Sequence, residues 1–329
     1  MAYFPLWLSR KGVWGEPLFD LQRAVPPRKT HTGGCGNMIF LDNLMNGLSL
    51  GSIYAIIALG YTMVYGIAKM LNFAHGDIIM VGAYIAFCGL QYWGLPPIVA
   101  ILAAMVVCTI LGITIEGLAY RPLRQAASLA VLITAIGMSY LLQNIALMIW
   151  GANPKSFPRT FINSSILHIG GLNIASATIY TILANVVIMI ALTLFTAKTK
   201  MGKAMRCVSE DRGAAELMGI NVNRTISVTF AIGSALAAIA GVLLCSSYPI
   251  LQPTTGSMPG IKAFTAAVFG GIGSIPGAML GGVLLGVIEI FGKAYISTEL
   301  GDAIVFAVLI VVLLVKPSGL LGKPVREKV

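Results

Sequence analysis

Long apolar runs follow one another along the chain from Leu44 to Val315, with short polar loops between them. Most of these runs are close to the roughly 20 residues that an α-helix needs to cross about 30 Å of hydrocarbon. The pattern therefore predicts an all-α fold, a polytopic transmembrane helical bundle of about eight spans. The predicted spans are 44–67, 74–93, 96–119, 128–150, 174–197, 225–248, 262–293 and 300–315.

The apolar run 262–293 is interrupted by GGIGSIPG at 270–277. This interruption favours two short elements, 262–272 and 276–293, which either cross as a pair or form a re-entrant hairpin. The number of spans is then eight or nine. Because a broken helix in a membrane must be covered by protein or water, we expect this stretch to lie inside the bundle.

Three glycines near the interruption are four residues apart: Gly273, Gly277 and Gly281. Small residues at this spacing on one helix face allow helices to approach closely in lipid. We therefore predict a helix-packing face, which serves either a contact with another subunit or packing within the chain.

Composition agrees with a membrane protein. The 329 residues are 57% hydrophobic and 10% charged, with a mean hydropathy of +0.87, whereas a soluble domain has about 25% charged residues. The net charge of +10 resides largely in short loops, which is typical of cytoplasmic loops rather than of a nucleic-acid surface. We expect contact with membrane lipid and no nucleic-acid partner. The five cysteines lack metal-ligand spacing, so no metal site is predicted.

The distribution of charge also orients the chain. The loops 120–127 and 198–224 carry clusters of Arg and Lys and are separated by two spans, so both are predicted to be cytoplasmic. The loop 151–173 is then external, and the turn LNFAHGD at 71–77 is cytoplasmic.

Two regions follow from this pattern. Residues 1–37 are basic and are broken by Pro26-Pro27 and Gly33-Gly34. We expect a poorly structured N-terminal extension, or a translated stretch upstream of a true start at Met38 that is not part of the native chain. Residues 38–329 form the predicted transmembrane domain.

The turn LNFAHGD places several polar residues between the first two spans. Asn72 is predicted to cap the second span, and Asp77 to lie at the positive end of that helix. Gly76 allows neighbouring backbone to approach closely. A catalytic role for His75 and Asp77 is disfavoured, because no Ser or Cys accompanies them and metal-site spacing such as H-E-x-x-H is missing. No catalytic residue and no cofactor is predicted, and the chain is not expected to be an enzyme.

The cytoplasmic loop predicts a short helix. Its sequence MGKAMRCVSEDRGAAELMGINVNR occupies 201–224, with Ser209 as the predicted N-cap and Gly219 at the left-handed position after the last turn. Such a helix either docks in a groove of a partner protein or lies on the membrane surface as an amphipathic connector.

Several stretches together resemble the permease subunits of bacterial ABC importers for branched-chain amino acids, the LivH-type family. The resemblance extends from about Asn43 to Val329. It rests on NGLSLGSIYAIIALGYTMVYGIAKMLNFAHGD (46–77), YRPLR (120–124), AIGMSYLLQN (135–144), EDRGAAELMGIN (210–221), SVTFAIGSALAAIAGVLL (227–244) and GIKAFTAAVFGGIGSIPGAMLGG (260–282).

The resemblance implies a permease of the bacterial inner membrane that forms the path for Leu, Ile and Val in an ATP-driven importer. The implied partners are a second homologous permease subunit, two cytoplasmic ATPase subunits and a periplasmic substrate-binding protein. ATP hydrolysis is expected in the partners, because the three Gly-Lys pairs of this chain are followed by Ala, Ala and Pro and so do not complete a Walker A motif.

Residues that carry the importer function are predicted in two groups. The coupling loop that meets the ATPase comprises Lys203, Glu210, Asp211, Ala214, Ala215, Gly219 and Ile220. Candidates for the translocation path or its cytoplasmic turn are Tyr54, Thr62, Tyr65, Asn72, His75 and Asp77.

An ion-coupled secondary transporter or channel for small hydrophobic solutes is the alternative. It requires ionisable groups near the membrane midplane, whereas Glu116 and Glu289 lie towards the ends of predicted spans. We expect Glu116 either to pair with Arg121 or to snorkel to the membrane surface, and Glu289 to pair with Lys293.

Overall fold

The computed structural model describes residues 36–124, 126–158, 166–169 and 172–322. Most of the predicted extension 1–37 lies outside the described residues, although the first helix already begins at Gly36. The helices are α1 (Gly36–Ala68), α2 (His75–Gln91), α3 (Pro97–Ile115), the π-helical turn η2 (Glu116–Tyr120), α4 (Ser128–Trp150), α5 (Ser176–Lys198), α6 (Lys200–Glu210), α7 (Arg212–Leu217), α8 (Val222–Ser247), α9 (Ser257–Gly270), α10 (Ile275–Tyr295) and α11 (Gly301–Val315).

The chain is an all-helical membrane protein, with strands confined to the connections. Within the described residues, six helices are long and apolar enough to cross a membrane, and α11 is a shorter apolar helix. The six are Ile39–Ala68, Pro97–Tyr120, Ser128–Trp150, Ser176–Lys198, Val222–Ser247 and Ile275–Tyr295. The strands form two antiparallel pairs, β1 (Lys155–Ser156) with β4 (Ile250–Leu251) and β2 (Ile166–Ile169) with β3 (Leu172–Ala175).

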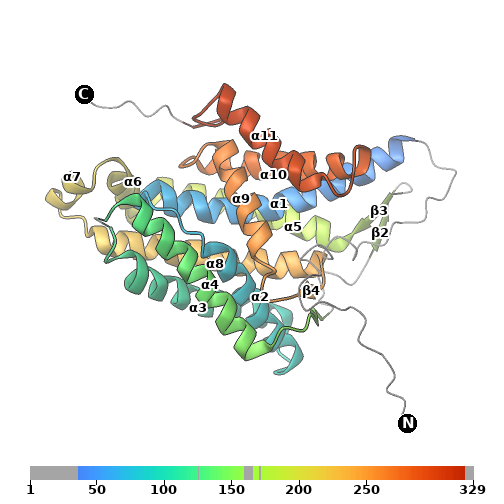
Figure 1. Cartoon of the computed structure of the whole chain (residues 1–329), viewed down its shortest axis with the longest axis horizontal. Helices are drawn as coiled ribbons and strands as arrows, with labels where there is room; N and C mark the ends of the chain where they lie inside the picture. The colour runs from blue at the N-terminus through green and yellow to red at the C-terminus, as the bar shows by residue number, and fades with distance from the viewer. Residues whose placement is uncertain (1–35, 125, 159–165, 170–171, 323–329) are drawn as a thin grey trace, which may run out of the picture. The chain divides into compact units, whose positions relative to one another are not determined.

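Helix α1 lies at the centre of the described bundle. Its most apolar window is 89% buried, whereas the corresponding windows of α4 and α5 are 17% and 22% buried. Helices α4 and α5 therefore turn most of their apolar surface outward, as expected for helices that face lipid. In Figure 1, α6 and α7 lie beyond the C-terminal end of α1, and the hairpin of β2 and β3 lies near its N-terminal end.

Glycines bring α1 and α10 into direct backbone contact. A Cβ atom built on Gly286 would overlap the backbone of Gly51, and one built on Gly282 would overlap the backbone of Ala55. The hydrophobic effect gives little force between helices in lipid, so such close van der Waals packing is what holds them together.

The interruption predicted within 262–293 is present at residues 271–274, between α9 and α10. Its backbone is covered by the C-terminal part of the chain. The N–H of Leu320 donates to the carbonyl of Phe269 (2.9 Å), and the N–H of Leu321 donates to the carbonyl of Gly270 (2.9 Å). The break therefore has the protein cover that a broken helix requires.

The predicted glycine face is wrong at one position. Gly273 lies in the turn before α10, with φ of 94°, and so it cannot share a helix face with the other two glycines. The sequence spacing could not reveal this, because the helix begins only after the turn. Gly277 and Gly281 do lie on α10, where both approach the end of α9: an added Cβ would overlap Gly270 or Ala266.

We predict that Gly286→Ala destabilises the protein by about 1–3 kcal/mol, the usual cost of overpacking a close-packed contact. The added methyl group meets the backbone of Gly51, which cannot rotate away. The measurement is the thermal unfolding midpoint in detergent. The matched control is Gly137→Ala in α4, where an added Cβ meets nothing within 4 Å; equal midpoints for both variants would contradict the prediction.

Candidate functional site

The chain leaves helical structure between α1 and α2. Helix α1 ends at Ala68, residues 69–74 form the connection, and α2 begins at His75. Lys69 adopts φ of 53°, in the left-handed region that side chains disfavour. The connection is therefore a sharply turned segment.

The first turns of α2 and α9 meet inside the bundle. A Cβ atom built on Gly76 would lie 2.7 Å from the carbonyl oxygen of Gly256 and 3.4 Å from the Cα of Gly260. Both helices are short, and both present the positive end of their dipole near this contact. The predicted close approach at Gly76 is thus present, and its partner is the start of α9.

Asp77 joins this contact through a neighbouring helix. Its buried carboxylate accepts a hydrogen bond from the side-chain amide of Gln143 on α4 (2.9 Å). The same amide nitrogen lies 3.2 Å from the hydroxyl of Ser257 at the start of α9. Asp77 lies in the first turn of α2, as predicted, where a negative charge is favoured. Gln143 therefore ties together the starts of two helices.

Asn72 is not the cap of α2, contrary to prediction. The N-cap residue is Ala74, which has no side-chain cap. The side-chain oxygen of Asn72 instead accepts a hydrogen bond from the hydroxyl of Tyr120 (2.9 Å). Both side chains are buried, and a buried hydroxyl needs a partner. Asn72 therefore anchors the connection to η2.

His75 is packed rather than exposed, with 1% of its surface accessible. Its ring meets Tyr61 edge to face, with ring centroids 4.6 Å apart. Its Nε2 faces Gly60 of α1, at 2.6 Å from where a Cβ atom of that glycine would lie. Among the residues that the structure describes, Nε2 has no hydrogen-bond partner, and the same holds for the buried hydroxyl of Thr62.

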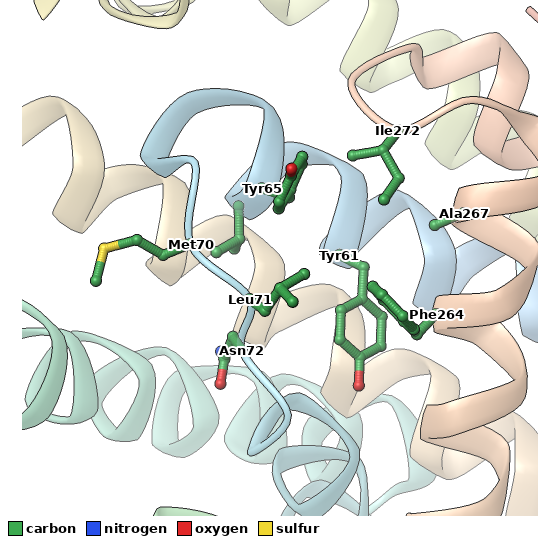
Figure 2. Close-up of a pocket in the computed structure, with 9 residues that line it drawn as sticks. Tyr61, Tyr65, Met70, Leu71, Asn72, Phe264, Ala267 and Ile272 are labelled. Atoms are coloured by element: carbon green, nitrogen blue, oxygen red, sulfur yellow. The ribbon is translucent and has the colours of Figure 1, made fainter. Parts of the chain in front are cut away.

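A small cavity lies between the end of α1, the connection 69–74 and α9 (Figure 2). Aromatic and aliphatic side chains supply most of its wall, and Asn72 adds an amide. Its volume of about 10 Å³ accommodates roughly one water molecule. The lining residues are Tyr61, Val64, Tyr65, Met70, Leu71, Asn72, Phe264, Ala267 and Ile272.

Only some of the predicted path residues meet at this cavity. Tyr65 and Asn72 line it, while Thr62 and Asp77 do not. Tyr54 lies elsewhere on α1 and donates a hydrogen bond from its hydroxyl to Glu289 (2.9 Å).

Glu289 is part of a buried ion network that the sequence revealed only in part. Its carboxylate lies 2.5 Å from the ammonium of Lys293, the predicted partner, and 2.7 Å from that of Lys262. The Lys262 ammonium also contacts Asp302 at 2.6 Å. The network joins α9, α10 and α11. Lys262, a lysine within an apolar run, is the feature of the sequence from which a buried ion pair could have been predicted.

Glu116 is also paired, but not with the predicted residue. Its carboxylate contacts the guanidinium of Arg124 and accepts a hydrogen bond from Ser227 on α8 (2.6 Å). The π-helical turn η2 shifts the register, since the N–H of Arg121 donates to the carbonyl of Glu116 five residues earlier (2.7 Å). Among the described residues, no group of three or more His, Cys, Asp or Glu side chains could hold a metal ion.

The loop 198–224, predicted to be cytoplasmic, forms two helices, α6 and α7. The N-cap of α7 is Asp211, whose carboxylate accepts from the N–H of Ala214 (3.1 Å). The predicted cap, Ser209, lies inside α6 and donates to the carbonyl of Arg206. Gly219 has φ of 79° and ends α7, as predicted, and the N–H of Ile220 reaches back to the carbonyl of Ala215 (3.0 Å).

The predicted coupling residues of this loop differ in how exposed they are. The predicted coupling residues Lys203, Glu210, Asp211, Ala214 and Gly219 are exposed, Ile220 is half-buried, and Ala215 is buried. Leu217 and Met218, which lie outside the predicted coupling set, are also strongly exposed, at 91% and 82%. An apolar pair at the end of a short helix is the feature expected of a docking surface.

Comparison with known proteins identifies the family. The family model described as "Branched-chain amino acid transport system / permease component" matches residues 43–313. The high-affinity branched-chain amino acid transport system permease protein LivH of Salmonella typhimurium is 47% identical over 305 residues, which cover 89% of this chain and 98% of that protein. The corresponding protein BraD of Pseudomonas aeruginosa is 46% identical, covering 88% and 98%. A probable LivH of Methanocaldococcus jannaschii is 30% identical, covering 85% and 91%.

These matches confirm the resemblance that the motifs indicated. The chain belongs to the family of permease components of branched-chain amino acid transport systems, as a multi-pass, non-catalytic membrane subunit.

Proposed function

We propose that this chain, together with a second related permease subunit, forms the path by which branched-chain amino acids cross the bacterial inner membrane. Two cytoplasmic ATPase subunits supply the energy, and a periplasmic binding protein delivers the substrate. The relatives named above are branched-chain amino acid permeases and match almost their whole length to this chain, which favours the importer over the ion-coupled alternative.

The observation that carries the proposal is the pair Leu217 and Met218 at the end of α7. Asp211 caps the start of this helix and Gly219 ends it, so the apolar pair is held on a defined support. A short helix with an exposed apolar end fits a groove on a partner. The ATPase is the partner that an ATP-driven permease requires on its cytoplasmic side.

The topology we propose has nine membrane-traversing segments. They are α1, α2, α3 with η2, α4, α5, α8, α9, α10 and α11, with α2 and α9 as short helices that begin inside the bundle. An outside start then gives a cytoplasmic C-terminus, in keeping with the positive-inside rule. Two contacts support this arrangement: β1 pairs with β4 on the proposed external side, and Leu320 meets the end of α9 on the proposed cytoplasmic side.

The cavity of Figure 2 is our candidate for part of the substrate path. Its aromatic and aliphatic lining suits a branched aliphatic side chain, and Asn72 offers an amide to the zwitterionic end. Alternating access requires the cavity to widen, because an amino acid is many times larger than one water molecule.

We predict that leucine uptake requires partner subunits. The chain is reconstituted in vesicles with the companion permease, the ATPase subunits and the binding protein of the same transport system, and labelled leucine is followed. Uptake should depend on ATP and on the ATPase. Uptake by this chain alone, driven by an ion gradient, would overturn the importer proposal in favour of a secondary transporter.

We predict that Leu217→Glu weakens binding of the ATPase, because a carboxylate replaces an apolar anchor. Loss of a central anchor costs about 2 kcal/mol or more, or roughly thirtyfold in dissociation constant. The measurement is binding of the purified ATPase to the permease in detergent. The control is Leu321→Glu, an exposed leucine (47%) outside α7. If Leu217→Glu binds as well as the control, α7 is not the docking surface.

We predict that Asn72→Ala impairs leucine transport more than Tyr120→Phe does. Each variant removes the same hydrogen bond, but Asn72→Ala also removes an amide from the cavity. Asn72→Ala leaves the Tyr120 hydroxyl unpaired and should cost about 1–3 kcal/mol of stability, which thermal unfolding reports separately. Equal transport by two variants that are both folded would show that Asn72 acts only as an anchor.

A further inference from the structure

A hydrogen bond joins the docking helix α7 to the end of α1. The guanidinium of Arg212, the first residue of α7, donates to the carbonyl oxygen of Ala68, the last residue of α1. The last carbonyls of a helix lack partners within it, and a positive charge near them is favoured by the helix dipole. Arg212 thus supplies a hydrogen-bond donor to a carbonyl at the end of α1, although it lies 144 residues further along the chain.

The end of α1 is also the edge of the cavity. Tyr65 lies in the last turn of α1, and Met70, Leu71 and Asn72 follow directly after the left-handed turn at Lys69. All four line the cavity of Figure 2. Ala68 is therefore the last helical residue before the segment that lines the cavity.

The residues around Arg212 leave the carbonyl of Ala68 as its hydrogen-bond acceptor among the described residues. Arg212 borders a cleft of about 430 Å³, together with Arg124 and Glu216. The nearby Arg124 is already paired with Glu116. Burial, and then the positive charge of Arg124, lower the pKa of Arg212. Among the described residues, no ion pair joins Arg212 to a carboxylate.

We propose that Arg212 is a positioning residue that transmits movement of α7 to the end of α1 and so to the cavity wall. The inference rests on the proposed function, in which the ATPase docks at Leu217 and Met218. Helix α7 has six residues, so its docked end and Arg212 are little more than one turn apart and move together. The adjoining cleft leaves room on one side of Arg212, so the contact with Ala68 can be released and remade.

The test compares two arginines in the assembled transporter. Arg212→Gln removes the charge and shortens the donor, while Arg212→Lys keeps a charged donor. The matched control is Arg206→Gln, because Arg206 also donates to a carbonyl near a helix end, that of Ala197 in α5 (3.3 Å). That bond joins α6 to α5 and does not involve α1. The readouts are ATPase binding, stimulation of ATP hydrolysis by leucine-loaded binding protein, and thermal unfolding.

We expect Arg212→Gln to stay folded and to bind the ATPase, but to lose stimulation on the order of fivefold or more, the lower range of measured coupling between sites. Arg212→Lys should restore part of the stimulation, and Arg206→Gln should resemble the wild type.

Normal stimulation in Arg212→Gln would overturn the inference, as would equal losses in Arg206→Gln. Loss of ATPase binding in Arg212→Gln would assign the residue to docking and would also overturn it. These results leave the proposed function intact, whereas failure of the wild-type chain to bind any ATPase would overturn the proposed function itself.

Discussion

Inside a membrane, a peptide N–H or C=O that leaves a helix finds no water, so the protein must supply a partner. Among the described residues, the connections 69–74 and 271–274 leave helical structure next to the cavity. Each interruption is covered by a segment that is distant in sequence. Arg212 reaches the carbonyl at the end of α1, and the backbone of Leu320 and Leu321 reaches the end of α9.

The same constraint explains where glycine is needed. A covered break requires two backbones to touch, and a side chain between them would hold them apart. Gly76 therefore faces Gly256 where α2 and α9 begin. The contact of Gly286 with Gly51 follows from a different requirement, the close crossing of α10 and α1. The cavity lies between the breaks, with Asn72 from the first and Ile272 from the second in its wall. The parts of the chain that can change shape without breaking a helix are thus the parts that surround the candidate path.

The sequence predicted what depends on local pattern. Apolar runs located the long helices, the Gly-Pro cluster located the break before α10, and Gly219 located the end of α7. It failed where a partner is far away along the chain. Asn72 was predicted to cap α2, but its side chain accepts a hydrogen bond from Tyr120, 48 residues further along the chain. No periodicity in the sequence indicates such a contact.

The buried ions illustrate the same limit. The prediction paired Glu289 with Lys293 because they are four residues apart, but Lys262 and Asp302 come from other helices. The prediction for Glu116 considered only the nearby Arg121, whereas its partners are Arg124, eight residues further along, and Ser227 on α8. A lone lysine in an apolar run indicated that a partner must exist, without indicating which residue it is.

The two breaks differ in how they are held, and the difference bears on how the cavity opens. The turn at 271–274 is fixed by backbone hydrogen bonds, and Lys262 further ties α9 to α10 and α11 through buried ion pairs. Breaking such a buried pair is costly, because it leaves an uncompensated charge. The connection 69–74 has local backbone hydrogen bonds, such as that from the N–H of His75 to the carbonyl of Asn72 (3.2 Å). Side chains of Tyr120, Gln143 and Arg212 hold it and the turns beside it to the rest of the bundle. Side chains can exchange partners while the helices stay intact. We therefore infer that the cavity opens towards the cytoplasm by movement of 69–74 against a fixed α9, and not by movement of α9 itself.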